Sequence, residues 1–183
     1  MAPPDSNWGS PQAFAMDSGD LFVLDPLTNS VWVYDGASEF RELPNFFFGD
    51  QVPSLQDVVD LTVSDGRLYL LYRDGHLTTS FYGSDDFTDP AIYQDPRDGF
   101  ENAATIGDAI FNQIQFAPPP DPSIYMLDPD GRSIYHFSLA LVYQRQYHGQ
   151  SSLPDKAATA FAVSHNHQVF LAIGNQIYFA LLP

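Results

Sequence analysis

Short runs of large apolar residues alternate with turn-forming residues along most of this chain. The clearest runs are LFVLDPLTNSVWVY at 21–34 and IYMLDPDGRSIYHF at 124–137, and weaker versions occupy 68–83 and 169–182. Successive side chains of a strand point to opposite faces, and in 31–34 both sets are large and apolar. A strand of this kind is expected to be buried on both faces, as in a sheet packed between two neighbours.

The runs belong to a repeat. Phe22, Tyr69, Tyr125 and Phe170 recur at intervals of about 45 to 56 residues. Each unit has a lead-in strand, at 13–16, 60–63, 113–116 and 160–163, followed by a tight turn and two further strands. The units extend over approximately 13–50, 57–100, 108–150 and 158–183. The pattern predicts an all-β fold of about four propeller-type blades in a single domain at 13–183.

The fourth unit is shorter than the others. A fourth segment follows in units one to three, at 40–48, 87–93 and 141–147, whereas the last unit stops after its third strand. The last blade is therefore expected to lack its outer strand. The segment 1–12 has three prolines, which suit a linker and make a poor closing strand. The missing strand could come from a larger propeller, from closure of a small four-unit ring, or from a second copy.

One segment has a helical pattern. Within 101–116, Ile106, Ala109, Ile110 and Gln113 are spaced as on one face of a helix. This segment is expected to form either a short helix or a loop that leads into the third unit.

Two stretches resemble a known type of repeat. Residues 19–26, GDLFVLDP, with 29–34, NSVWVY, and residues 123–137, SIYMLDPDGRSIYHF, resemble NHL and YVTN propeller repeats. Units two and four depart from the pattern, with Tyr72-Arg73 and Ala172-Ile173 in place of Asp-Pro. The resemblance implies a propeller, with the chain as the C-terminal part of a larger bacterial one. Such repeats occur in scaffold proteins, sensor ectodomains, and some lyases and lactonases, so the fold alone does not define the function.

The charge and the composition exclude several classes of partner. Lysine and arginine number 7 against 23 aspartate and glutamate residues, giving a net charge of −16. Nucleic-acid binding requires clustered cations, and no such cluster occurs. No apolar run reaches the length of about 18 residues that membrane insertion requires. The absence of cysteine excludes disulfides and thiolate chemistry.

Candidate binding residues are few. Arg73, His76 and Arg132 are scarce cations in predicted turns and could orient an anionic group. The three phenylalanines Phe46, Phe47 and Phe48 lie in a predicted outer strand and are expected either to contact a partner or to pack between blades. No catalytic residue, metal site or cofactor is expected, because the lead-in strands offer few ligands.

These observations favour a non-catalytic binding or scaffold module that recognises a protein or a small ligand. One alternative is a lactonase-like or lyase-like enzyme with a channel metal, and another is an assembly piece that completes a ring by dimerisation. The expected partner is a protein or a second copy, with no nucleic acid and no membrane insertion. The compartment stays open, with an extracellular or periplasmic part of a larger protein favoured over a cytoplasmic one.

Overall fold

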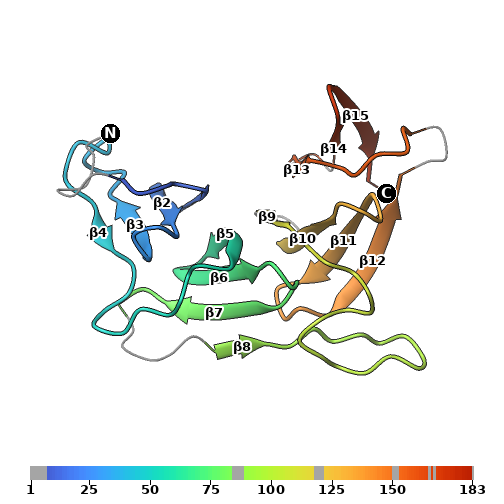
Figure 1. The fold of residues 1–183 in the computed structure, drawn as a ribbon, viewed down its shortest axis with the longest axis horizontal. Coiled ribbons are helices and arrows are strands. Elements are labelled where there is room, and N and C mark those ends of the chain that lie inside the picture. Colours follow the sequence, from blue (N-terminus) through green and yellow to red (C-terminus); the bar gives the residue numbers. More distant parts are fainter. Residues whose placement is uncertain are drawn as a thin grey trace. The chain divides into compact units, whose positions relative to one another are not determined.

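A computed structural model describes residues 8–83, 89–117, 122–149, 153–164, 166 and 168–182. In these ranges the chain forms only strands, bridges and turns, grouped into four antiparallel sheets (Figure 1). Sheet 1 contains β1 (Ala13–Asp17), β2 (Asp20–Asp25), β3 (Ser30–Tyr34) and β4 (Asn45–Phe46). Sheet 2 contains β5 (Val58–Ser64), β6 (Arg67–Tyr72), β7 (Leu77–Phe81) and β8 (Asp89–Ala91).

Sheet 3 contains β9 (Gln113–Ala117), β10 (Ser123–Asp128), β11 (Ser133–Ser138) and β12 (Tyr143–His148). Sheet 4 has three strands, β13 (Ala160–Val163), β14 (Gln168–Ile173) and β15 (Gln176–Leu181). In every sheet the strands pair in chain order. The predicted fold class is confirmed: the protein is all-β, with four propeller-type blades, and in the described residues the last blade has three strands and no outer strand. The described part of the chain contains no helix that is long and apolar enough to cross a membrane.

The helical alternative for 101–116 is wrong. Residues 101–112 form loop and turn, with Ala103 bridged to Tyr93, and β9 begins at Gln113. Ile106 and Phe111 are buried from this loop, and Gly107 has a positive φ of 55°. The apolar side chains are therefore buried by the loop itself, without the helix that their spacing permits.

The chain divides into two compact units. The first comprises Met1–Tyr72 and Leu77–Pro90, and the second comprises Arg73–His76 and Ala91–Pro183. Sheets 1 and 2 belong to the first unit and sheets 3 and 4 to the second, apart from the last residue of β8.

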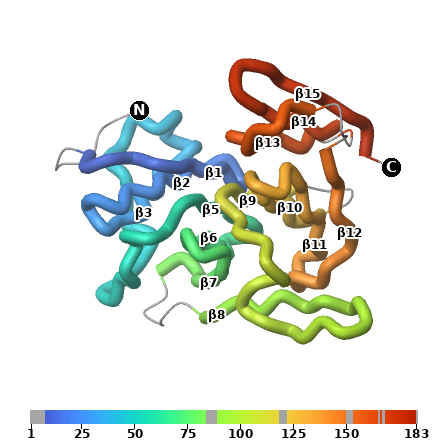
Figure 2. Tube along the Cα trace, turned by 45° about the vertical axis from the view of Figure 1, so that its right-hand side comes forward, coloured from blue at the N-terminus to red at the C-terminus, as the bar shows by residue number. Residues whose placement is uncertain are grey.

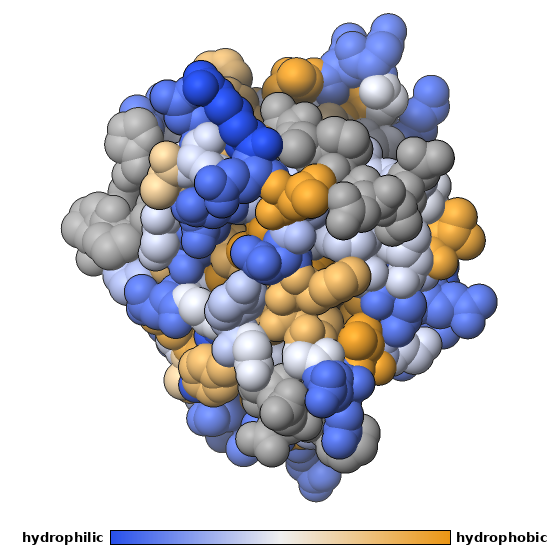
Figure 3. Space-filling view, turned by 90° about the vertical axis from the view of Figure 1, so that its left-hand side faces the viewer, coloured by the Kyte–Doolittle hydropathy of each residue, from blue (hydrophilic) through white to orange (hydrophobic). Residues whose placement is uncertain are grey.

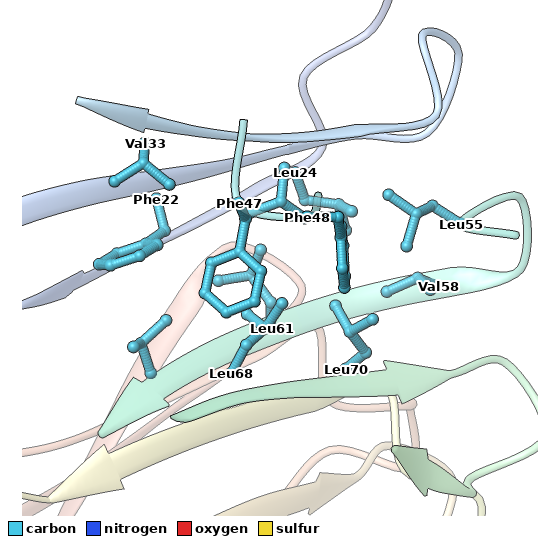
Figure 4. Close-up of a cluster of buried hydrophobic side chains, with 12 residues drawn as sticks. Phe22, Leu24, Val33, Phe47, Phe48, Leu55, Val58, Leu61, Leu68 and Leu70 are labelled. Atoms are coloured by element: carbon cyan, nitrogen blue, oxygen red, sulfur yellow. The ribbon is translucent and has the colours of Figure 1, made fainter. Parts of the chain in front are cut away.

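The core of the first unit lies between two sheets (Figure 4). Phe22, Leu24, Val31 and Val33 come from sheet 1, and Leu61, Val63, Leu68 and Leu70 come from sheet 2. Phe47 and Phe48 follow β4 and fill the space between them, with their ring centroids 5.1 Å apart. The residues from β2 and β3 occupy alternate positions of strands that are buried on both faces, as the apolar pattern predicts.

The core of the second unit combines packing with side-chain hydrogen bonds. Tyr125, Leu127 and Ile134 of sheet 3 cluster with Phe161, Val163, Val169 and Leu171 of sheet 4. The amide N–H groups of Phe161 and Val163 each donate to a glutamine side chain of β9, Gln113 and Gln115, over 2.8 Å. Side chains thus satisfy the edge of β13 with which no strand of the described residues pairs.

A buried carboxylate anchors the segment before sheet 1. Asp25 is completely buried and accepts hydrogen bonds from the backbone N–H groups of Gly9 at 2.7 Å and Ser10 at 2.8 Å. The Thr28 N–H also donates to it, over 3.4 Å. Burial raises the pKa of the Asp25 carboxyl, but these donors outweigh burial and hold that pKa below its ordinary value of 3.8. Residues 9 and 10 are therefore fixed to sheet 1 by a charged acceptor.

We predict that Phe47→Ala lowers the free energy of unfolding by about 3–5 kcal/mol, because the fully buried ring leaves a cavity between sheets 1 and 2. The neighbouring Phe46 is 58% exposed, so Phe46→Ala is the matched control and should cost about 1 kcal/mol or less. Urea denaturation measures both changes. Equal losses in the two variants would contradict this assignment of the core.

We also predict that Asp25→Asn destabilises the protein by about 1.5–3 kcal/mol at pH 7, because hydrogen bonds to a charged acceptor are lost. Since the folded-state pKa of Asp25 is lowered, its stabilisation is present above the unfolded-state pKa and is lost as the pH falls through the folded-state pKa. The difference between wild type and variant should therefore shrink below about pH 4. Thermal unfolding from pH 7 to pH 3 tests this, and a difference that stays constant with pH would contradict it.

Candidate binding site

A groove of about 670 Å³ lies between sheets 3 and 4 of the second unit. Its walls come from β11 and β12 on one side and from β14 and β15 on the other. The lining residues are Arg132, Ile134, Gln146, Tyr147, His148, Gly149, Leu153, Val169, Leu171, Ile177, Tyr178, Phe179, Ala180, Leu181 and Leu182. The groove therefore opens beside the last strand of the three-stranded sheet.

Among the described residues, no strand pairs with the outer edge of β15, which lies at this groove. It pairs with β14 on one side, and the other three sheets carry an outer strand at the corresponding position. In sheet 3 that strand is β12, which pairs antiparallel with β11 through Ile134 opposite Tyr147. The six residues of β15 span about 20 Å and present unpaired backbone donors and acceptors. A further extended strand would complete the sheet.

The groove is mainly apolar. Leu171 and Leu182 line it and are buried, and Tyr147 and Leu153 pack against the same cluster. Among the described lining residues, Arg132 supplies the permanent charge, and its guanidinium donates to the carbonyl oxygen of Pro154 over 2.8 Å. A ring nitrogen of His148 lies 2.8 Å from the hydroxyl oxygen of Ser133. The lining favours an uncharged, partly apolar segment as its occupant.

The predicted site residues do not converge on this groove. Arg132 does line it, although its guanidinium is engaged with residues 154 and 155. Arg73 and His76 lie in the turn between β6 and β7 and do not line it, and the His76 ring is 2.5 Å from the Asp74 carboxylate.

The three phenylalanines are divided between surface and core. Phe46 is exposed, with its ring centroid 4.5 Å from that of Trp32, whereas Phe47 and Phe48 are buried between sheets 1 and 2. Of the three, only Phe46 is placed to contact a partner. Sequence reasoning missed the groove, and its signal was the absent outer strand of the last unit.

A second polar cluster fixes the loop before β9. The Arg97 guanidinium donates to both carboxylate oxygens of Asp95, and its carbon atom lies 4.1 Å from the Phe100 ring centroid and 4.2 Å from that of Tyr143. The hydrogen bond from Arg97 holds the pKa of Asp95 below its ordinary value, although burial opposes this. Asp95 and Arg97 thus pair their charges and hydrogen-bonding groups with each other. The described residues contain no group of three or more histidine, aspartate or glutamate side chains that could hold a metal ion.

Known proteins resemble this chain in structure. No family model and no curated protein sequence matches it. The computationally designed Ika4 protein is 14% identical, with a TM-score of 0.56 over 98% of this chain and 96% of that one. The designed Ika8 protein is 13% identical, with a TM-score of 0.54, and the chain spans 46% of its length. Virginiamycin B lyase from Staphylococcus aureus is 10% identical, with a TM-score of 0.55 over 94% of this chain and 70% of that one.

Likenesses at such low identity define the fold alone. Together with the strand order of the four sheets, they identify the chain as a propeller-type protein. The propeller part of the expected family resemblance is confirmed, and the assignment to the NHL or YVTN type stays a prediction.

Proposed function

We propose that this protein is a non-catalytic binding module that takes up an extended polypeptide segment as an added strand along β15. The observation that carries the proposal is the edge of β15 beside an apolar groove, which no described strand covers and which lies at the position that an outer strand fills in sheets 1 to 3. A propeller-type fold is in general suited to binding or scaffold roles, and this edge supplies a specific place for a partner.

The chemistry of the groove defines the segment that would fit. Backbone hydrogen bonds to β15 would provide affinity, and alternate side chains of the bound strand would enter the groove beside Tyr147 and Leu153. By analogy with β12 on β11, the segment would run antiparallel to β15. An uncharged, partly apolar segment fits best, because a carboxylate or ammonium group would lose its hydration without a partner.

The remaining residues suggested by the sequence and the enzyme alternative are secondary to this proposal. Phe46, Arg73 and His76 remain candidate contacts for further parts of a protein partner. The enzyme alternative stays a prediction, since virginiamycin B lyase shares the fold at 10% identity. Tightly bound Ca²⁺ or Zn²⁺ in the purified protein would favour that alternative.

The binding test uses a synthetic peptide of residues 139–149, which contains β12, with glutamine in place of Arg145 (LALVYQQQYHG) so that its side chains carry no permanent charge. We predict one-to-one binding by isothermal titration calorimetry. Ala180→Glu should weaken binding at least about tenfold, because it places a carboxylate in the groove. Ala180 is exposed, so folding should be unaffected.

Gln176→Glu is the matched control, since it adds the same charge to β15 at a residue outside the groove lining, and it should bind as wild type does. A peptide with proline in place of Gln146 should bind poorly, because proline cannot donate to a ladder. No binding of the first peptide, or equal binding of both peptides to all three proteins, would contradict the proposal.

A further inference from the structure

A second exposed surface covers one face of sheet 4. Ile177, Phe179 and Leu181 of β15 are 73%, 74% and 72% exposed. The strand register places Phe170 opposite Phe179 and Ala172 opposite Ile177, so these side chains share one face. Figure 2 traces β13, β14 and β15 as neighbouring runs at the C-terminal end of the chain. We call the surface formed by Ala160, Ala162, Phe170, Ala172, Ile177, Phe179 and Leu181 the rear face of sheet 4.

The repeat shows what such a face does elsewhere in the chain. In sheet 1, Val31 and Val33 occupy the positions of Ile177 and Phe179, and Phe22 occupies that of Phe170. Val31 and Val33 are 1% and 6% exposed, because they pack in the cluster shared with sheet 2. Residues at these positions of the repeat therefore pack against the next sheet along the chain.

Sheet 1 carries the complementary surface. Phe14, Met16 and Phe46 are 74%, 57% and 58% exposed on the face opposite the core with sheet 2. The AFA motif aligns Phe14 with Phe161 of sheet 4, which is buried in the cluster shared with sheet 3. We call the surface formed by Phe14, Met16 and Phe46 the front face of sheet 1; Val23 and Trp32 on the same side are already buried, with Trp8, Leu21 and Phe40 packed against them. By this alignment, the front face of sheet 1 corresponds to the face of sheet 4 that packs against sheet 3, the sheet before it in the chain.

We propose that the rear face of sheet 4 binds the front face of sheet 1 of a second copy. One chain carries one face of each kind, and the proposed dimer joins two copies head to tail through two such contacts. Each contact would continue the sheet-to-sheet packing that already joins sheets 1 and 2 and sheets 3 and 4. Neither face contains a charged residue, so no buried ion has to be compensated. Ile177, Phe179 and Leu181 also border the groove, but Ala180 faces it from the opposite face of β15.

The chain charge makes the association dependent on salt. Each copy has a net charge of −16, so two copies repel one another at low ionic strength. Figure 3 shows one side of the molecule, on which hydrophobic patches interrupt a largely hydrophilic surface. Screening weakens the repulsion and leaves the apolar contact in place, so added salt should strengthen the dimer.

Sedimentation equilibrium tests the proposal. At about 50 µM protein in 0.5 M NaCl, wild type should have twice the chain mass of 20.4 kDa, with a larger monomer fraction in 0.05 M NaCl. Phe179→Lys should sediment at the chain mass, although it lowers the net negative charge. Leu27→Lys is the matched control, because Leu27 is also 74% exposed but lies in the turn between β2 and β3, and it should stay dimeric.

The complementary variant separates this arrangement from others. Phe14→Lys should also be monomeric, and an equimolar mixture with Phe179→Lys should recover part of the dimer, because one intact contact can form. A dimeric Phe14→Lys would contradict the head-to-tail arrangement and favour self-pairing of sheet 4. A monomeric wild type at both salt concentrations would overturn the proposal. Circular dichroism confirms that each variant is folded, and peptide binding to Phe14→Lys tests the groove independently.

Discussion

Every sheet of this protein has large apolar side chains on both faces. A sheet is stabilised when these side chains are buried against a neighbouring sheet. All five residues of β3 are buried, and the central strands β6 and β10 are buried over most of their length. Removing apolar surface from water contributes about 25 cal/mol per Å², whereas a single small sheet is marginally stable by itself. The fold therefore depends on sheets packing face to face, and each of the two units contains one such pair.

Backbone polar groups that are not paired between strands impose a second requirement. Side chains meet it in several places: Asp25 for residues 9 and 10, Gln113 and Gln115 for β13, and Asn29 for Leu55. Among the described residues, no side chain or strand does the same for the outer edge of β15. The last sheet thus lacks a partner both at its edge and on its rear face. This explains why the proposed strand addition and the proposed self-association both involve β15.

The sequence predicted the blades well because their apolar alternation and their turns are local signals. The lead-in strands, the double burial of β3 and the absent fourth strand of the last unit could all be read from short segments. The groove could not be predicted from short segments, because its walls come from β12 and β15, two strands that are distant in sequence. The division of the three phenylalanines was also beyond prediction, since Phe47 is buried only once sheet 2 lies beneath it. The helical spacing in 101–116 suggested a helix that does not form, because a loop buries Ile106 and Phe111 equally well.

Hydrogen exchange tests most directly whether covering both faces determines the stability of a blade. Strands β6, β10 and β14 are each paired on both sides, but β14 is covered on one face only. The measurement is best made on the Phe14→Lys protein, in which these three strands are unaltered and the proposed dimer contact is broken. The account predicts that amides of β14 exchange at least about tenfold faster than those of β6 and β10. Equal protection in all three strands would contradict it.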